Sequence, residues 1–191
     1  MKHYILKFIV QSNDYWAEKM TVSDSAVTTN HLDGTRYNNP DLNISLLGTR
    51  GTLSGYIGNL YGLDIVSEEI KELFTEYGKD FVECYKVGLQ RKSAKQFYFI
   101  NILDNIYCFD FENSVYEEYG AGSRIIRNID RLVLNEERIS GRHFFRISEL
   151  PFEIIVSEAF KLAMEDRGID IVKFTPVDAF KFDPTGFDWN N

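Results

Sequence analysis

The apolar and polar positions along the chain form patterns that predict many short strands and two helices. Apolar side chains recur at helical spacing in residues 67–77, where Ile70, Leu73 and Phe74 form one stripe, and again in residues 157–167. Runs rich in β-branched and aromatic residues predict strands at 2–10, 81–89, 96–103, 106–111, 124–134, 142–147 and 171–174. Because strands outnumber helices and follow one another in runs, the pattern favours an α+β fold, with the helices packed on a mainly antiparallel or mixed sheet.

One predicted strand has no polar face. Residues 96–103 read QFYFINIL, so both sides of this strand carry large apolar groups. A strand of this kind lies in the middle of a sheet that is covered on each side. We therefore expect a central strand here.

A segment of 25 residues occurs twice, at 63–87 and at 153–177, and the two copies align without a gap. The nine identical positions are Ile65/Ile155, Val66/Val156, Ser67/Ser157, Glu68/Glu158, Lys71/Lys161, Gly78/Gly168, Asp80/Asp170, Val82/Val172 and Val87/Val177. Each copy runs from a short strand through a helix into a second strand. The internal repeat therefore predicts two similar strand-helix-strand units, with helices at about 67–77 and 157–167.

Helix ends explain several identical residues of the repeat. Ser67 and Ser157 stand where each helix begins, and a serine there accepts a hydrogen bond from an unpaired backbone amide. Gly78 and Gly168 stand where each helix ends, a place that favours glycine in the left-handed conformation. The repeat thus predicts the architecture of the fold but indicates no chemical reaction.

The length and composition predict one domain with two less regular segments. We expect residues 1–191 to form a single α+β domain. Residues 11–43 are polar and are interrupted by Asn-Asp, Asp-Gly and Asn-Asn-Pro, which predicts a long loop or a loosely ordered arm, with Trp16 and Tyr37 packing back onto the body. Residues 178–191 form an aromatic C-terminal tail that Pro and Gly interrupt.

Four glycines fall close together after this arm. They are Gly48, Gly51, Gly55 and Gly58. Neither a following Gly-Lys-Ser/Thr nor the spacing G-x-G-x-x-G is present, so tight turns and a hairpin are favoured over a nucleotide loop. No cofactor is predicted.

The charge and the apolar runs narrow the range of partners. The formal net charge is -8, from 21 basic and 29 acidic side chains, which argues against a nucleic-acid partner. Every apolar run is far shorter than the roughly 20 residues of a membrane span, and the first residues lack a signal-peptide pattern. We therefore expect a cytoplasmic protein that does not bind a membrane.

The cysteines and histidines predict no metal site and no disulfide. Cys84 and Cys108 fall in strand-like segments, where cysteine usually behaves as a small buried hydrophobe. His3, His31 and His143 have no spacing typical of a zinc site.

Acidic and aromatic side chains gather in residues 104–119, and no basic residue occurs between Lys95 and Arg124. The protein-binding surface predicted here consists of Asp104, Tyr107, Asp110, Glu112, Tyr116, Glu117, Glu118 and Tyr119. Aromatic anchors with an acidic rim suit a basic protein partner, because opposite charge speeds encounter and fixes specificity. Two other interpretations stay open: a solvated strand and turn, and an active site with two converging carboxylates, one of raised pKa.

A group of arginines follows the acidic segment. They are Arg124, Arg127, Arg131, Arg138, Arg142 and Arg146. We expect them to neutralise the acidic block, with an anion site as the alternative. No G-x-S-x-G motif is present, and no catalytic residue is assigned.

Several short motifs occur in an order that resembles a known family. They are Ile65-Val66-Ser67-Glu68, the strand YFINIL, the segment DFENS at 110–114, Phe145-Arg146, Ile155-Val156-Ser157-Glu158, Phe160-Lys161, Gly168 and Phe174-Thr175-Pro176. Together they resemble the immunity-protein family numbered eleven of bacterial polymorphic toxin systems, first described as a domain of unknown function. The similarity covers about residues 44–177, and the chain departs from the family at Asp170, where a second glycine is common.

The resemblance implies a non-enzymatic immunity protein, or antitoxin, that binds a cognate bacterial toxin domain and blocks it. The family supplies no catalytic residue to carry over. Two alternatives stay open: a carboxylate-based hydrolase that uses Asp104, Asp110, Glu112, Glu117 or Glu118, and an adaptor module that helps to load a secreted effector.

Overall fold

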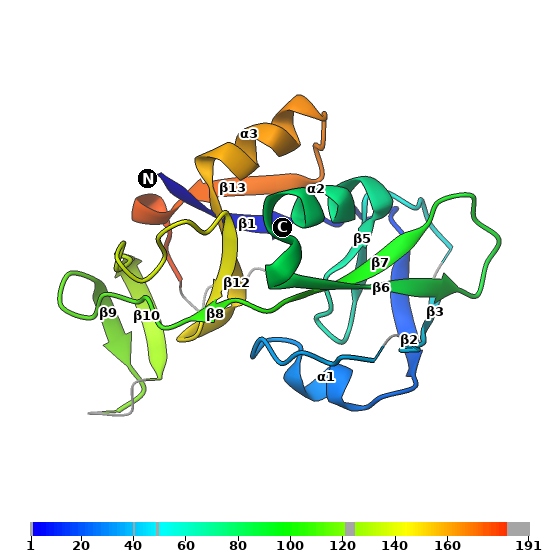
Figure 1. The fold of residues 1–191 in the computed structure, drawn as a ribbon, viewed down its shortest axis with the longest axis horizontal. Coiled ribbons are helices and arrows are strands. Elements are labelled where there is room, and N and C mark those ends of the chain that lie inside the picture. Colours follow the sequence, from blue (N-terminus) through cyan, green and yellow to red (C-terminus); the bar gives the residue numbers. More distant parts are fainter. Residues whose placement is uncertain (1, 40, 49, 121–124, 183–191) are drawn as a thin grey trace.

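The computed structural model describes residues 2–39, 41–48, 50–120 and 125–182. The fold is α+β, as the apolar pattern predicts. Figure 1 shows two helices, α2 (Glu68–Gly78) and α3 (Glu158–Asp166), side by side on top of two β-sheets. The helix predictions at 67–77 and 157–167 are confirmed to within a residue.

Six strands close into a barrel. In their order around the barrel they are β2 (Trp16–Val22), β3 (Ile44–Gly48), β6 (Val82–Leu89), β7 (Phe97–Ile102), β5 (Ile65–Ser67) and β4 (Tyr56–Asn59). Two of the pairings, β2 with β4 and β3 with β6, are parallel, and the others are antiparallel. Large apolar side chains fill the interior, among them Ile44, Leu46, Ile57, Phe97 and Phe99.

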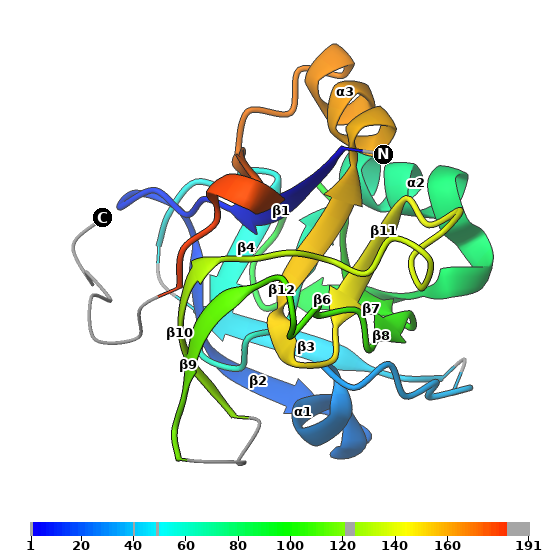
Figure 2. The ribbon, with the colours of Figure 1, turned by 90° about the vertical axis from the view of Figure 1, so that its left-hand side faces the viewer.

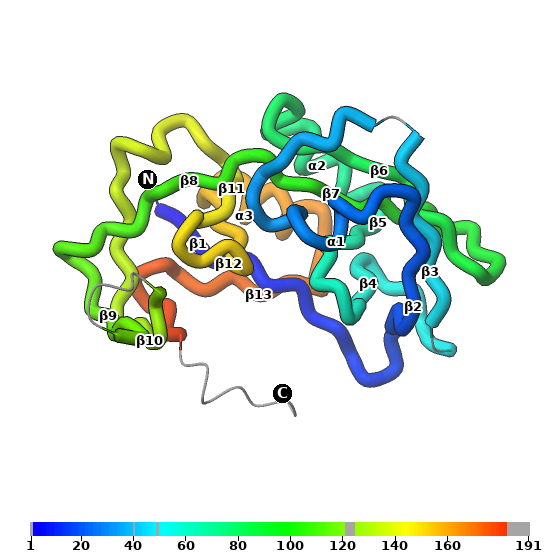
Figure 3. The backbone as a smooth tube through the Cα atoms, turned by 90° about the horizontal axis from the view of Figure 1, so that it is seen from below, coloured from blue at the N-terminus to red at the C-terminus, as the bar shows by residue number. Residues whose placement is uncertain are grey.

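Five strands form the second sheet. Across it they are β13 (Val172–Pro176), β1 (His3–Phe8), β12 (Leu150–Ser157), β11 (Phe144–Ile147) and β8 (Asn105–Ile106). A separate two-stranded ribbon of β9 (Val115–Glu118) and β10 (Ile126–Arg131) packs on the face that the helices leave open, with Ile126 and Ile129 against Ile5 and Ile155. Figure 2 looks at this end of the molecule, and Figure 3 shows the ribbon and the barrel at opposite ends.

The short elements lie outside these sheets. They are the helix α1 (Ala26–Asn30) and the 3-10 helices η1 (Lys79–Phe81) and η2 (Val177–Ala179).

The central strand predicted at 96–103 is β7, and both of its faces are buried. Phe97 and Phe99 point into the barrel, whereas Ile100 and Ile102 belong to the core beneath the two helices. In that core Phe74 of α2 packs edge-on against Phe160 of α3, with ring centroids 4.9 Å apart. One apolar strand therefore serves two hydrophobic cores.

The two copies of the repeat have the same strand register. In the first copy, Phe99 of β7 lies between Ile65 of β5 and Tyr85 of β6. In the second copy, Ile5 of β1 lies between the matching residues, Ile155 and Thr175. Each unit is therefore a strand-helix-strand whose two parallel strands are separated by one antiparallel strand, which comes from elsewhere in the chain.

This arrangement explains two identical residues that helix ends leave unexplained. The Tyr98 hydroxyl bonds to Glu68 at 3.2 Å, and the Lys71 ammonium lies 4.8 Å from the centre of the Tyr98 ring. In the second unit, Tyr4 makes the same contacts with Glu158 at 3.4 Å and with Lys161 at 5.4 Å. Glu and Lys recur because each unit places a tyrosine of its middle strand below its helix.

The predicted helix ends are right in one copy and wrong in the other. The Ser157 hydroxyl accepts from the Phe160 amide at 3.2 Å, and Gly168 has a left-handed φ of 68°. Ser67 occupies the N-cap position without a side-chain capping bond, and Gly78 has an extended φ of -177°. Gly78 is required for a different reason: a Cβ there would lie 2.9 Å from the Phe144 ring.

The prediction of a loop or arm at 11–43 is wrong for its first part, because residues 16–22 form barrel strand β2. Ala17, Met20 and Val22 pack against the barrel core, but a register shift between Ala17 and Lys19 leaves Glu18 and Lys19 both exposed, so the apolar positions do not alternate regularly. The prediction that Tyr37 packs onto the body is confirmed by ring contacts with Tyr85 and Phe99. Trp16 lies in β2, beside Gly58 of β4.

Two predicted strands are shorter than expected. Of the strand predicted at 106–111, Ile106 pairs in a sheet as the last residue of β8, and Phe109 makes only an isolated bridge with Leu134 before the turn at 111–113. The strand predicted at 124–134 is reduced to β10, and Arg124 lies outside the described residues. In the C-terminal tail Phe180 is buried, and residues 183–191 also lie outside the described part.

Candidate functional site

A cavity of about 750 Å³ collects most of the predicted surface residues. Five of the eight line it: Tyr107, Asp110, Glu112, Tyr116 and Glu118. The other lining residues are Phe109, Phe111, Asn135, Arg138 and Glu149. We call this the acidic-aromatic cavity.

Three rings build the apolar part of the acidic-aromatic cavity. The ring centroids of Phe109 and Phe111 are 4.7 Å apart, and that of Tyr116 lies 5.3 and 5.5 Å from them. The strand alternation of β9 places Tyr116 and Glu118 on this side. Aromatic faces and carboxylates therefore share one hollow.

Asp110 has a structural task in this cavity. Its carboxylate accepts from the backbone amides of Glu112 and Asn113, each at 3.1 Å, and from the Asn113 side chain at 2.7 Å. These bonds, led by that of the Asn113 side chain, hold the pKa of Asp110 below its usual range. Asp110 thus stays ionised and fixes the turn between Phe109 and β9.

Three predicted residues lie away from the cavity. Asp104 is bound in an ion pair with Arg142. Glu117 and Tyr119 project from the other side of β9, where the Tyr119 ring is 63% exposed and Arg127 lies 5.9 Å from its centre. One strand therefore divides the predicted set between two faces.

Glu149 is the cavity residue that the sequence analysis missed. It lies in the turn between β11 and β12, far from residues 104–119 along the chain. An acidic residue is common in a surface turn, so its position in the sequence did not indicate a site. Burial raises its pKa, an effect that the nearby backbone amides and Arg138 reduce. The carboxylate of raised pKa in this cavity is thus not one of the five acidic candidates.

The chain matches the immunity protein family (Imm11) over residues 9–187, which is most of its length. The chain belongs to this immunity protein family. No curated protein matches it.

The match to the immunity protein family corrects the range expected from the short motifs. It begins at residue 9 and so includes most of residues 1–43, which had suggested no family. The structure gives the reason, because β2 is part of the barrel that the repeat completes. The order and spacing of the motifs identified the family, whereas the irregular alternation of β2 left the first part of the match unrecognised.

The arginines of this Imm11 member neutralise the acidic block only in part. Arg142 pairs with Asp104, and Arg131 and Arg138 donate to the carbonyl oxygens of Asn113 and Tyr107, at 2.8 and 2.7 Å. Arg146 instead turns away and pairs with Asp64 beside the barrel. The acidic-aromatic cavity therefore keeps four carboxylates around one arginine, Arg138.

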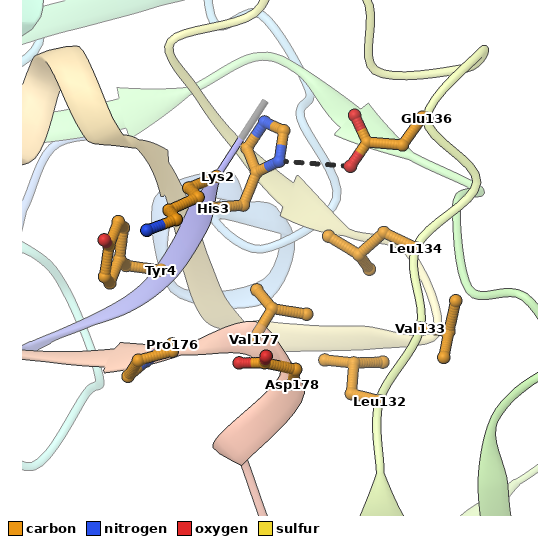
Figure 4. A pocket seen from close by; sticks show the side chains of 10 residues that line it. All are labelled: Lys2, His3, Tyr4, Leu132, Val133, Leu134, Glu136, Pro176, Val177 and Asp178. Carbon is orange, nitrogen blue, oxygen red and sulfur yellow. Dashed lines mark ion pairs between the residues drawn. The ribbon is translucent and has the colours of Figure 1, made fainter.

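A second cavity, of about 540 Å³, is lined by residues of three segments, 2–4, 132–136 and 176–178 (Figure 4). Leu132, Leu134 and Val177 line its apolar part, and His3 Nδ1 lies 3.5 Å from Glu136 Oε1 at its edge. Its charged lining residues are Lys2, Glu136 and Asp178, and its lining residues include no serine, threonine or cysteine. The lining therefore lacks the hydroxyl or thiol nucleophile of a hydrolase triad.

Other kinds of site find no support within the described ranges. There, no three His, Cys, Asp or Glu side chains are grouped so that they could hold a metal ion. Cys84 and Cys108 are free thiols, and burial raises the pKa of Cys108 to about 12, which leaves it unreactive. None of the described helices is long and apolar enough to span a membrane.

Proposed function

We propose that this member of the immunity protein family neutralises a cognate bacterial toxin domain by binding it, without catalysis, through the acidic-aromatic cavity. Family membership supports the immunity role. The observation that supports the binding site is the convergence of Tyr107, Tyr116 and three carboxylates on one hollow of about 750 Å³. The proposed place of action is the cytoplasm, without nucleic acid or membrane.

The shape and charge of the cavity suit recognition of a protein surface. Tyr107 is 68% exposed at the rim and also borders a smaller hollow beside Pro151, so the two hollows adjoin at this side chain. A tight complex buries on the order of 800 Å² on each partner and depends on a few desolvated aromatic side chains. The acidic rim favours a basic partner, which it would attract from a distance.

The test is a rescue experiment in bacterial cells that express the cognate toxin domain, which we expect to be encoded by a neighbouring gene. Cells that also express the chain should survive, and the two purified proteins should form a complex. Charge reversal of Glu112 and Glu118 together should abolish rescue. The matched control is Glu117→Lys, on the opposite face of β9.

Two outcomes would contradict the proposal. If the wild-type chain forms no complex at micromolar concentration, toxin binding is refuted. If the charge-reversed variant still rescues, the cavity is not the binding site. An adaptor would change secretion of the effector and leave cells unprotected, so the survival readout separates the two functions.

A further inference from the structure

Glu149 has an unusual environment at the acidic-aromatic cavity. Its Oε2 atom is covered and accepts no hydrogen bond. Within the described residues no basic group lies within ion-pair distance of it. Arg138, which also lines the cavity, directs Nη1 to the carbonyl oxygen of Tyr107 at 2.7 Å. Burial of this carboxylate is costly, and the nearby backbone amides and Arg138 offset this cost only in part, so a cation that enters the cavity would offset more of it.

We infer that Glu149 and the rings of Phe109 and Tyr116 form a socket for an arginine side chain of the toxin domain. This inference rests on the proposed function and names the group that the cavity recognises. A guanidinium inserted there would donate to the Glu149 carboxylate and lie against the aromatic faces.

The lining favours a cation over an apolar anchor. Four carboxylates, those of Asp110, Glu112, Glu118 and Glu149, face one arginine across the cavity. Asp110 uses its oxygens for the turn at 110–113, whereas burial makes Glu149 the carboxylate of the four that an added cation would stabilise most. The remaining two supply negative potential at the rim, where solvent screens them.

The rings favour arginine over lysine. The guanidinium is planar, stacks on aromatic faces, donates two parallel bonds to one carboxylate, and is more weakly hydrated than an ammonium. The cluster of Phe109, Phe111 and Tyr116 supplies such faces beside Glu149. The lysine ammonium would lose more hydration and gain less contact.

The socket predicts a direction for the effect of pH. Burial raises the pKa of Glu149, whereas the backbone amides of Glu149, Phe109 and Cys108 and the charge of Arg138 lower it. The thiol of Cys108 also faces Glu149, but it carries no charge near neutral pH. The rim carboxylates Asp110, Glu112 and Glu118 also face the incoming cation. A guanidinium favours the ionised Glu149, so affinity should fall as the pH is lowered through the raised pKa of the free protein.

The first experiment uses small probes and does not depend on the toxin. N-acetyl-arginine methylamide and its neutral analogue N-acetyl-citrulline methylamide are titrated into the isotope-labelled chain, and amide chemical shifts are recorded. The arginine probe should bind in the millimolar range, with shifts at Phe109, Tyr116 and Glu149, and Glu149→Gln should remove them. Equal shifts with both probes, or none with either, would overturn the socket.

The second experiment uses the toxin domain from the rescue assay. Glu149→Gln should lower affinity at least roughly tenfold and abolish its loss at acidic pH, because truncation of a buried charge partner is costly. Glu117→Gln, on the outer face of β9, is the matched control and should bind as the wild type does.

A structural role of Glu149 would give a different result. Glu149→Gln removes a buried charge, so the variant should unfold at an equal or higher temperature while binding more weakly. Unchanged affinity of this variant would refute the socket and leave toxin binding intact. Binding of the arginine probe without any toxin complex would instead refute the proposed function and leave the socket.

Discussion

Arg146 of β11 forms a buried ion pair with Asp64, which directly precedes β5, and so joins the five-stranded sheet to the barrel. Arg146 is 2% exposed, and its other terminal nitrogen donates to the carbonyl oxygen of Pro151 at 2.9 Å. The pair thus connects segments that lie 82 positions apart in the chain. We expect it to hold the two sheets in one relative orientation.

Removal of one partner should be far more harmful than removal of both. Arg146→Met leaves the Asp64 carboxylate buried and uncompensated, which should cost about 3–5 kcal/mol of unfolding free energy. The double variant Asp64→Leu/Arg146→Met should lose much less than the sum of the two single losses. Urea unfolding of the four proteins measures this coupling, and additive losses would show that the pair is not coupled.

The two serines of the repeat should differ in their contribution to stability. Ser157 is fully buried, caps α3 and lies 2.9 Å from His143 Nδ1, so Ser157→Ala should cost about 1–2 kcal/mol. Ser67 makes no side-chain capping bond, so Ser67→Ala should cost no more than about 0.5 kcal/mol. Thermal unfolding compares them, and equal losses would contradict the structural difference.

The two glycines should also respond differently. Gly78→Ala brings a methyl group to 2.9 Å from the Phe144 ring, and such overpacking costs about 1–3 kcal/mol. Gly168→Ala meets nothing within 4 Å but forces alanine to a φ of 68°, a cost of about 1 kcal/mol. Phe144→Leu should partly rescue Gly78→Ala and leave Gly168→Ala unrescued. Rescue of both by Phe144→Leu would argue against the contact.

His31 should make the fold sensitive to mild acid. Burial, and then the charge of Arg146, lower its pKa in the folded state, so the unfolded chain takes up the proton first. The stability that depends on neutral His31 is complete above the unfolded pKa of about 6.5 and is lost as the pH falls below it.

A comparison with His31→Leu isolates this effect. The difference in unfolding free energy between the wild type and the variant should shift against the wild type by at most about 1.4 kcal/mol per pH unit below 6.5. Glu149 and Glu153, whose pKa values burial raises, act in the opposite direction but are present in both proteins. A difference that stays constant from pH 7.5 to 5 would contradict the assignment.

The predictable parts of the fold are those whose residues alternate between core and surface at a regular spacing. The stripe of Ile70, Leu73 and Phe74 predicted α2, and the two apolar faces of residues 96–103 predicted β7. Strand β2 escaped prediction because a register shift between Ala17 and Lys19 interrupts its alternation, although Met20 and Val22 pack against the barrel core. The two matching glycines of the repeat also have different roles. Gly78 leaves room for the Phe144 ring, whereas Gly168 adopts a left-handed φ.

The sequence predicted those residues of the candidate site that lie close to one another along the chain. Tyr107, Asp110 and Tyr116 converge because they lie close together in the sequence, on either side of the turn at 111–113. Glu149 joins them through the pairing of β11 with β8 and β12, which no spacing along the chain reveals. Conversely, the alternation of β9 separates Glu117 and Tyr119 from their neighbours, although all lie within one acidic segment.

The origin of the middle strand in each repeated unit has a kinetic consequence. Tyr98 and Glu68 meet across 30 positions of the chain, whereas Tyr4 and Glu158 meet across 154. All six barrel strands lie within residues 16–102, so the barrel can close during synthesis while β1 still waits for β12 and β13. The acidic-aromatic cavity is lined by residues between 107 and 149, all made after the last barrel strand, so we expect it to form only after the barrel has closed.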